Sequence, residues 1–183
     1  EKRDLNFALG RLITAFGGDS KSFDESVKSL DETCANLSNL ESSTQVYSLD
    51  NSVSDGGVTY DTKTGNVVIG YANTALFVHE STHAGQFESG EIGFDSQTGA
   101  TYAQDTGDEI AGYKAQYAYD PSSVSGLNSN STVNSSADIT VSWLQNLTKS
   151  DGSKPYSQGG SANTGISPVN INSNAQQINK AYN

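Results

Sequence analysis

The feature that most constrains this chain is its only two histidines, which lie four residues apart in the string His79-Glu80-Ser81-Thr82-His83. Residues four apart share one face of an α-helix, so two imidazole nitrogens can reach one metal ion if this segment is helical. Glu80 then lies beside the metal, where its carboxylate can accept a proton. The same spacing also suits a packed or solvated histidine pair that binds no metal.

The residues around this string predict a helix with inward-facing histidines. Asn73 is a suitable N-cap, and a helix over 74–87 places His79 on one broad face with Leu76, Glu80, His83 and Phe87. Other helices are expected where apolar residues recur at helical spacing, over 5–16, 20–37, 105–119 and 139–147, with a last helix over 173–182.

Strand signals separate these helices and indicate an α+β fold. Two hairpins are expected at 58–71 and 92–102, because apolar runs there flank a polar link that ends in Gly. A further short strand is expected at 45–49. The tracts 121–134 and 148–170 are rich in Ser, Asn and Gly, which predicts long loops in the C-terminal part.

Composition excludes several classes of partner. The formal net charge of -11 repels nucleic acids and anionic membranes, and no stretch is apolar enough to span a bilayer. The chain begins with Glu1 and contains no Met, so we expect it to be a processed part of a longer protein. The single cysteine, Cys34, continues an apolar series at helical spacing, which predicts a buried structural thiol. That series is Phe23, Val27, Leu30, Cys34 and Leu37.

A catalytic zinc ion needs a third protein ligand, and the chain has no third histidine. The candidates are acids downstream of His83, namely Glu88, Glu91, Asp95, Asp108 and Glu109. Glu88 and Glu91 follow the histidines too closely to fold back. We favour Glu109, with Asp108 as the second choice, because Glu109 begins a second helix from which a carboxylate can complete the site. A capping box over 106–109 is the alternative role of Glu109.

A tyrosine is expected beside this site. Tyr113 lies one turn after Glu109 on the same helix face, where its hydroxyl can stabilise an oxyanion. Tyr102 and Tyr117 are alternatives for the same role, and a tyrosine that only packs is the simpler interpretation. The strand over 66–71 directly precedes the histidine helix, and as a sheet edge it could pair with an extended peptide substrate.

The segment Phe77–Gln86 and the strand before it resemble the zincin metallopeptidases. With Glu109, in the string Glu-Ile-Ala-Gly-Tyr-Lys-Ala-Gln, the chain looks like the gluzincin branch of this group. The pattern H-E-x-T-H-x-x-Q is similar to that of small bacterial metallopeptidase domains at the ends of large secreted, toxin-type proteins. The resemblance covers residues 58–119.

This resemblance implies a zincin-like α+β fold with a small antiparallel or mixed sheet and an active-site helix. The chain is then a single metallopeptidase-like domain over 1–183, with a helical part at 1–40, a zincin core at 58–119 and a loop-rich part at 121–183. It implies a Zn²⁺ cofactor bound by His79 and His83, Glu80 as general base, and a secreted or extracellular location.

The expected function is zinc-dependent hydrolysis of peptide bonds in peptide or protein substrates, in which the metal activates a water molecule and Glu80 accepts its proton. The alternative is a non-catalytic zincin-fold module that serves in binding or scaffolding within a larger secreted protein. A metal-dependent hydrolase acting on a bond other than a peptide bond is a third interpretation.

Overall fold

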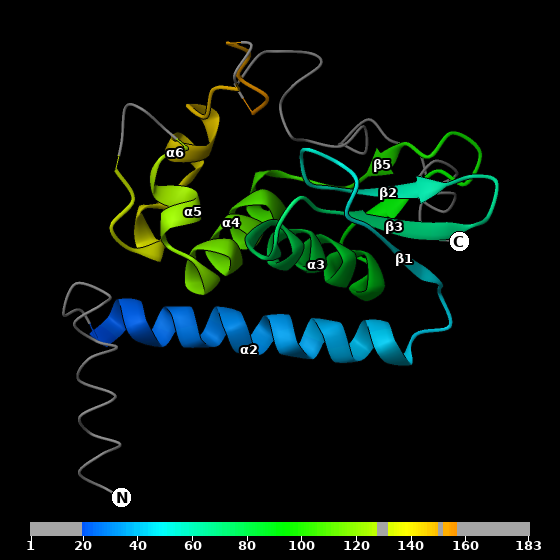
Figure 1. Ribbon diagram of the computed structural model, residues 1–183, viewed down its shortest axis with the longest axis horizontal. Helices are drawn as coiled ribbons and strands as arrows, with labels where there is room; N and C mark the ends of the chain where they lie inside the picture. Colours follow the sequence, from blue (N-terminus) through cyan, green and yellow to red (C-terminus); the bar gives the residue numbers. More distant parts are fainter. Residues whose placement is uncertain (1–19, 128–131, 150–151, 157–183) are drawn as a thin grey trace, which may run out of the picture.

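The structure is a computed structural model that describes residues 20–127, 132–149 and 152–156, and it confirms the α+β fold. In Figure 1, α2 (Ser20–Ser42) lies along one side of α3 (Thr74–Ser89) and α4 (Thr106–Tyr119), and the strands gather at one end of these helices. The helices predicted over 5–16 and 173–182 lie outside the described residues. Among the described helices, none is both long and apolar enough to cross a membrane.

Helix α3 is the central element of the fold. It begins where the Asn73 side chain accepts a hydrogen bond from the backbone N–H of Leu76, as predicted, and ends at Gly90 in the left-handed region (φ 81°). Every residue from Val78 to Gln86 is buried, because α2, α4 and strand β3 (Asn66–Gly70) surround this part of the helix. The predicted inward face is therefore only part of a stretch that is buried all round.

The main sheet has three strands in the order β1-β3-β2, with β1 at Tyr47–Asp50 and β2 at Gly57–Asp61. Strands β2 and β3 form the predicted antiparallel hairpin, and β1 pairs with β3 in parallel. The expectation that the strand over 66–71 is a sheet edge is wrong, because β1 occupies its second edge. The strand edges of this sheet belong to β1 and β2.

A second, shorter hairpin follows α3, as predicted. It consists of β4 (Gly93–Phe94) and β5 (Thr101–Tyr102), which pair antiparallel. The Asp95 carboxylate accepts hydrogen bonds from the backbone N–H groups of Gln97 and Thr98, at 2.9 and 2.8 Å, and so stabilises the turn. The Phe94 ring stacks on Tyr60 of β2 with 6.1 Å between ring centroids, which holds this hairpin against the main sheet.

The prediction of a buried Cys34 is wrong, because α2 buries a different face. The buried residues of that face are small and hydroxylated: Ser22, Ser26 and Thr33. The hydroxyls of Ser26 and Thr33 donate to backbone carbonyls one turn earlier in α2, both at 2.9 Å, so neither needs a partner on another element. Cys34 lies outside this buried face and is exposed.

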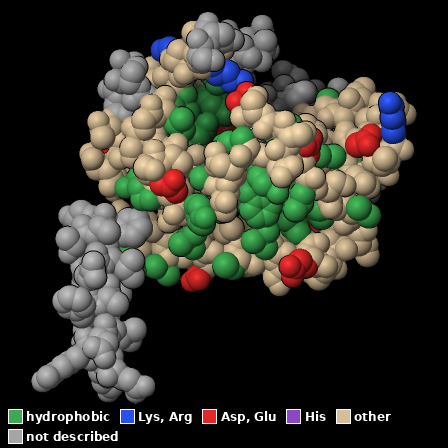
Figure 2. Space-filling model, viewed as in Figure 1, with side chains coloured by type: hydrophobic (Ala, Val, Ile, Leu, Met, Phe, Trp, Pro, Cys, Tyr) green, Lys and Arg blue, Asp and Glu red, His purple; other side chains and the backbone are tan. Residues whose placement is uncertain are grey.

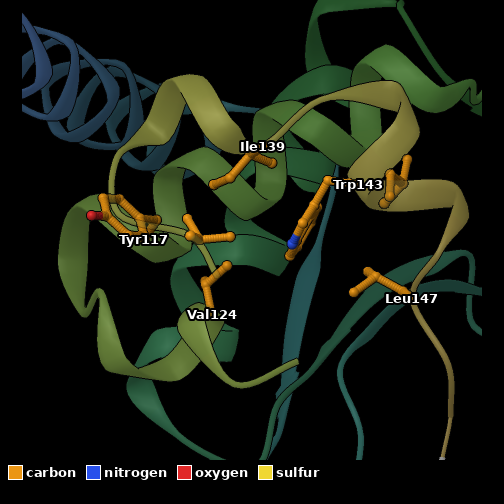
Figure 3. Close-up of a cluster of buried hydrophobic side chains, with 7 residues drawn as sticks. Tyr117, Val124, Ile139, Trp143 and Leu147 are labelled. Carbon is orange, nitrogen blue, oxygen red and sulfur yellow. The ribbon is translucent and has the colours of Figure 1, made fainter. Parts of the chain in front are cut away.

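A hydrophobic cluster packs around α4 and the chain that follows it (Figure 3). Short helices from the C-terminal part build it, namely α5 (Ser122–Ser125), the 3-10 helix η1 (Ser136–Asp138) and α6 (Val141–Gln145). Its buried members are Tyr117, Val124, Val133, Ile139, Trp143, Leu144 and Leu147. The loop predicted over 121–134 is thus replaced at 122–125 by a helix whose Val124 is buried. The cluster also supports Tyr113 and Tyr156, which are partly buried against it.

We predict that Leu144→Ala lowers the free energy of unfolding by about 2–5 kcal/mol, because Leu144 is fully buried in this cluster and its loss leaves a cavity. Val141→Ala in the same helix is the matched control: Val141 is 43% exposed, and we expect a change within about 0.5 kcal/mol. Denaturant unfolding measures both. Equal effects of the two substitutions would contradict the assignment of the cluster as core.

Candidate metal centre

Helices α3 and α4 bring together three side chains that can hold a metal ion: His79, His83 and Glu109. The two Nε2 atoms of the histidines lie 3.1 Å apart. Glu109 Oε2 lies 3.7 Å from His79 Nε2, and Glu109 Oε1 lies 3.7 Å from His83 Nε2. All three residues are buried. The group matches the ligand set expected from the sequence.

Two glutamines determine which nitrogen of each imidazole faces this group. His79 Nδ1 lies 3.0 Å from Gln116 Oε1, and His83 Nδ1 lies 2.8 Å from Gln86 Oε1. The amide nitrogens point to other acceptors, to the Ser123 hydroxyl for Gln116 and to the Asp108 carbonyl for Gln86, which orients the amide oxygens toward the rings. An amide oxygen only accepts hydrogen bonds, so each Nδ1 carries the proton.

When both imidazoles are neutral, their two Nε2 atoms therefore present lone pairs to each other. Two lone pairs at 3.1 Å repel, and a cation between them relieves the repulsion. Their separation is close to the distance of about 3.3 Å between two ligand atoms in a tetrahedral site with bonds of about 2.0–2.1 Å. Together with the Glu109 carboxylate, this donor set fits a divalent metal ion such as zinc.

Two donors orient the Glu109 carboxylate. The Gln104 amide donates to Oε1 and the Tyr156 hydroxyl donates to Oε2, both at 2.9 Å. Burial by itself raises the pKa of this carboxyl, but its interactions with His79 and His83 in their protonated forms, together with the Tyr156 hydroxyl, outweigh it and lower the pKa. Glu109 is thus held as a carboxylate, the form that binds a metal.

The capping box at the start of α4 differs from the one predicted. Asp105 is the N-cap, its side chain accepts from the backbone N–H groups of Gly107 and Asp108, and the Asp108 carboxylate accepts from the backbone N–H of Asp105 at 2.7 Å. The predicted box over 106–109 is therefore wrong by one residue. Because Asp108 caps the helix, Glu109 is left to face the histidines.

The other acids considered as third ligands lie elsewhere. The Glu88 side chain, at the exposed end of α3, accepts hydrogen bonds from the hydroxyls of Ser43 and Tyr47. Glu91 is exposed, and Asp95 is buried in the hairpin turn described above. In the described part of the chain, the metal-binding group with the histidines contains Glu109 and none of these acids.

Glu80 lies beside the three ligands and is only 6% exposed. Burial raises the pKa of its carboxyl to about 7, with the charge of His83 acting against this rise and that of Glu109 adding to it. Its Oε1 lies against the backbone of Gly56, just before β2, so closely that a β-carbon at this position would overlap it. Gly56 therefore makes room for the Glu80 carboxylate, a role that the sequence pattern did not reveal.

Tyr113 lies at the site, as expected, and its ring packs edge-on against His79 with 4.5 Å between ring centroids. Tyr102 and Tyr117, the two alternatives, direct their hydroxyls to Asp95 and to the Asn134 carbonyl. Burial, followed by the charge of Glu109, raises the pKa of the Tyr113 hydroxyl, which therefore stays protonated and able to donate a hydrogen bond.

Tyr156 is a site residue that the sequence reasoning missed. It lies in the tract over 148–170 that was predicted to be loop, and it approaches Tyr113 with 6.5 Å between ring centroids. Burial is the main reason that the pKa of its hydroxyl is raised, so it too remains a donor. The available signal was its isolation, because Tyr156 is the only aromatic residue between Trp143 and Tyr182.

Gly112 allows α4 to approach the metal ligands. A β-carbon at this position would lie 2.7 Å from His79 Nε2, so any larger side chain would displace the imidazole. The site opens into a cavity of about 480 Å³, lined on the sheet side by Val58 and on the opposite side by Leu147 and Tyr156. On the face shown in Figure 2, a hollow with hydrophobic side chains opens near the top of the molecule.

Comparisons with known proteins leave the family of this chain open. No protein-family model matches it, and no curated protein or solved structure is significantly similar to it.

We predict that Glu109→Ala weakens zinc binding by more than about 100-fold, because the loss of a ligand exceeds the 10–100-fold effect typical of an outer partner. Asp108→Ala is the matched control: it removes the Asp108 half of the capping box of α4, lowers stability by about 1 kcal/mol and leaves zinc affinity unchanged. Zinc titration against a competing chelator measures both. If Asp108→Ala binds zinc more weakly and Glu109→Ala does not, Asp108 and not Glu109 is the third ligand.

We predict that Gly112→Ala weakens zinc binding at least about tenfold while the helix stays formed, because the added methyl group displaces His79. Inside a helix, alanine is more stabilising than glycine by about 0.5–1 kcal/mol, so a loss of zinc affinity in this variant cannot come from a weaker helix. Gly126→Ala is the control, since no heavy atom lies within 4 Å of the added β-carbon. Equal zinc affinities would show that α4 does not need this close approach.

Proposed function

We propose that this protein is a zinc-dependent metallopeptidase of the zincin type, which hydrolyses peptide bonds with Glu80 as general base. The observation that carries the proposal is the convergence of His79, His83 and Glu109 beside the buried Glu80 carboxylate at an open cavity. These three side chains would fill three positions of a tetrahedral metal ion and leave the fourth free for water, which is the arrangement of a catalytic site.

Zinc is the metal proposed because two imidazoles and one carboxylate are a donor set that it commonly binds. A zinc ion held there supplies a Lewis acid that lowers the pKa of a coordinated water toward about 7 and polarises a carbonyl group. The chain itself must then hold the ligands in place, move a proton and position the substrate.

Glu80 is proposed to move the proton. Its carboxylate is next to the ligands but is not one of them, and its position against Gly56 fixes it between the metal centre and the beginning of β2. From there it can take the proton of the attacking water and then deliver it to the amine that leaves. The absence of a bulky side chain at residue 56 is what permits this position.

Tyr113 is proposed to stabilise the negative charge that develops on the carbonyl oxygen of the substrate. Its hydroxyl is kept protonated by burial, and its ring is positioned by His79 on one side and by Trp143 on the other, at centroid distances of 4.5 and 5.1 Å. Tyr156 is less suited to this role, because its hydroxyl proton is used by Glu109.

An extended peptide is the proposed substrate, and β2 is the strand proposed to bind it. Strand β2 is an edge of the main sheet, and its Val58 lines the same cavity as the metal-binding group, as do Asp55 and Gly56 just before the strand. Backbone hydrogen bonds to such an edge bind a peptide without regard to most side chains. This replaces the strand over 66–71 as the binding edge.

We predict that Glu80→Gln retains zinc but lowers peptide hydrolysis by about 10²–10⁴-fold, because the amide has the shape of the carboxylate and cannot accept the proton. Glu88→Gln is the matched control in the same helix, since Glu88 is exposed and turned toward Ser43 and Tyr47. Hydrolysis of a mixed peptide library, followed by mass spectrometry, and zinc content measure the two properties separately.

Turnover retained in Glu80→Gln would refute the role of Glu80. Zinc bound by the unchanged chain without cleavage of any peptide would instead favour the binding or scaffolding module. Cleavage of a different bond by the zinc-loaded chain would redirect the proposal to another class of metal-dependent hydrolase.

A further inference from the structure

Every residue of the metal-binding group has a hydrogen-bond partner outside the group, and each of these partners is uncharged. Gln116 accepts from His79, Gln86 accepts from His83, and Gln104 and Tyr156 donate to Glu109. The partner distances lie between 2.8 and 3.0 Å. Three amides and one phenol therefore surround the site.

The two amides that face the histidines are part of the helix framework. Gln86 and Gln116 are only 8% and 3% exposed. Gln86 extends from α3, and its amide nitrogen lies 3.4 Å from the Asp108 carbonyl of α4. Gln116 extends from α4 to His79 of α3, while its amide nitrogen donates to Ser123 beyond the end of α4. Each glutamine thus links one histidine to the opposite helix or to the chain that follows it.

The charge of the group explains why amides suit these positions. Carboxylates often accept the Nδ1 proton of a metal-binding histidine. Here Glu80 and Glu109 are already two buried carboxyl groups close to each other. A carboxylate at position 86 or 116 would add another negative charge to a buried region, which is costly when no cation is bound.

We propose that Gln86, Gln104, Gln116 and Tyr156 form an uncharged outer shell that holds His79, His83 and Glu109 in their metal-binding geometry before the ion arrives. This inference rests on the metal site of the proposed function but does not require peptide hydrolysis. Its two parts are separate: the amide oxygens fix the tautomers of the histidines, and the neutrality of the shell keeps the metal-free site stable.

The experiment compares Gln116→Leu with Gln116→Glu. Leucine keeps a side chain of similar size but removes the acceptor, so zinc affinity falls by about 10–100-fold. Glutamate keeps an acceptor for Nδ1 and restores the affinity, but it lowers the thermal midpoint of the metal-free chain by at least about 4 °C. Zinc therefore raises the midpoint of Gln116→Glu by more than it raises the midpoint of the unchanged chain.

Gln45→Leu is the matched control, because the Gln45 amide donates to the Val46 and Gly65 carbonyls and contacts no ligand of the metal. We expect its zinc affinity to equal that of the unchanged chain. Circular dichroism of the metal-free variants checks that each is folded. Should Gln116→Leu fail to fold, Gln86→Leu tests the same acceptor at His83.

Unchanged zinc affinity in the folded leucine variant would overturn the role of the amides. An equal zinc-induced shift in Gln116→Glu and the unchanged chain would overturn the role of neutrality. A chain that binds no zinc at all would overturn both, together with the metal site. Because affinity and thermal midpoints are measured without substrate, a failure to hydrolyse peptides leaves this inference standing and affects only the proposed function.

Discussion

The packing of α4 against α3 is the interaction on which the rest of the structure depends. It brings Glu109 to within 3.7 Å of both histidines, and it is possible only because Gly112 presents no side chain to His79. On its other side, α4 is supported by the hydrophobic cluster, where Trp143 packs on Tyr113. The C-terminal cluster is thus a structural support for the candidate metal centre as well as a core.

A central helix that is buried all round and carries His79, Glu80, His83 and Gln86 is costly, because polar groups lose water without always gaining equal partners. Three of these side chains recover hydrogen bonds within the fold. Within the described part of the chain no hydrogen bond compensates Glu80 in this way, and burial raises the pKa of its carboxyl to about 7. Only 34% of the residues in the chain are hydrophobic. The compact cluster around α5 and α6 therefore contributes apolar burial that offsets the free-energy cost of this polar site.

Sequence reasoning succeeded where the decisive contacts are local. The helix with His79 and His83, its Asn73 cap and the two hairpins follow from spacing and turn residues within a few positions. It failed at Cys34, where helical periodicity predicted that an apolar face of α2 is buried. In the structure, α2 instead buries Ser22, Ser26 and Thr33 when it packs against α3 and α4. It also failed for β3, because the parallel partner β1 comes from a separate segment whose pairing leaves no local signal.

The sequence by itself determined the pair of histidines, the carboxylate between them and the need for a non-histidine third ligand, since these follow from residue identity and helical period. Only the tertiary structure decided between Asp108 and Glu109, because the cap at Asp105 engages one and the approach of α4 presents the other. It also brought Gln116 to His79, 37 residues away in the sequence, and Tyr156 to Glu109, 47 residues away. Contacts over such separations depend on how whole helices pack, and no local pattern encodes that packing.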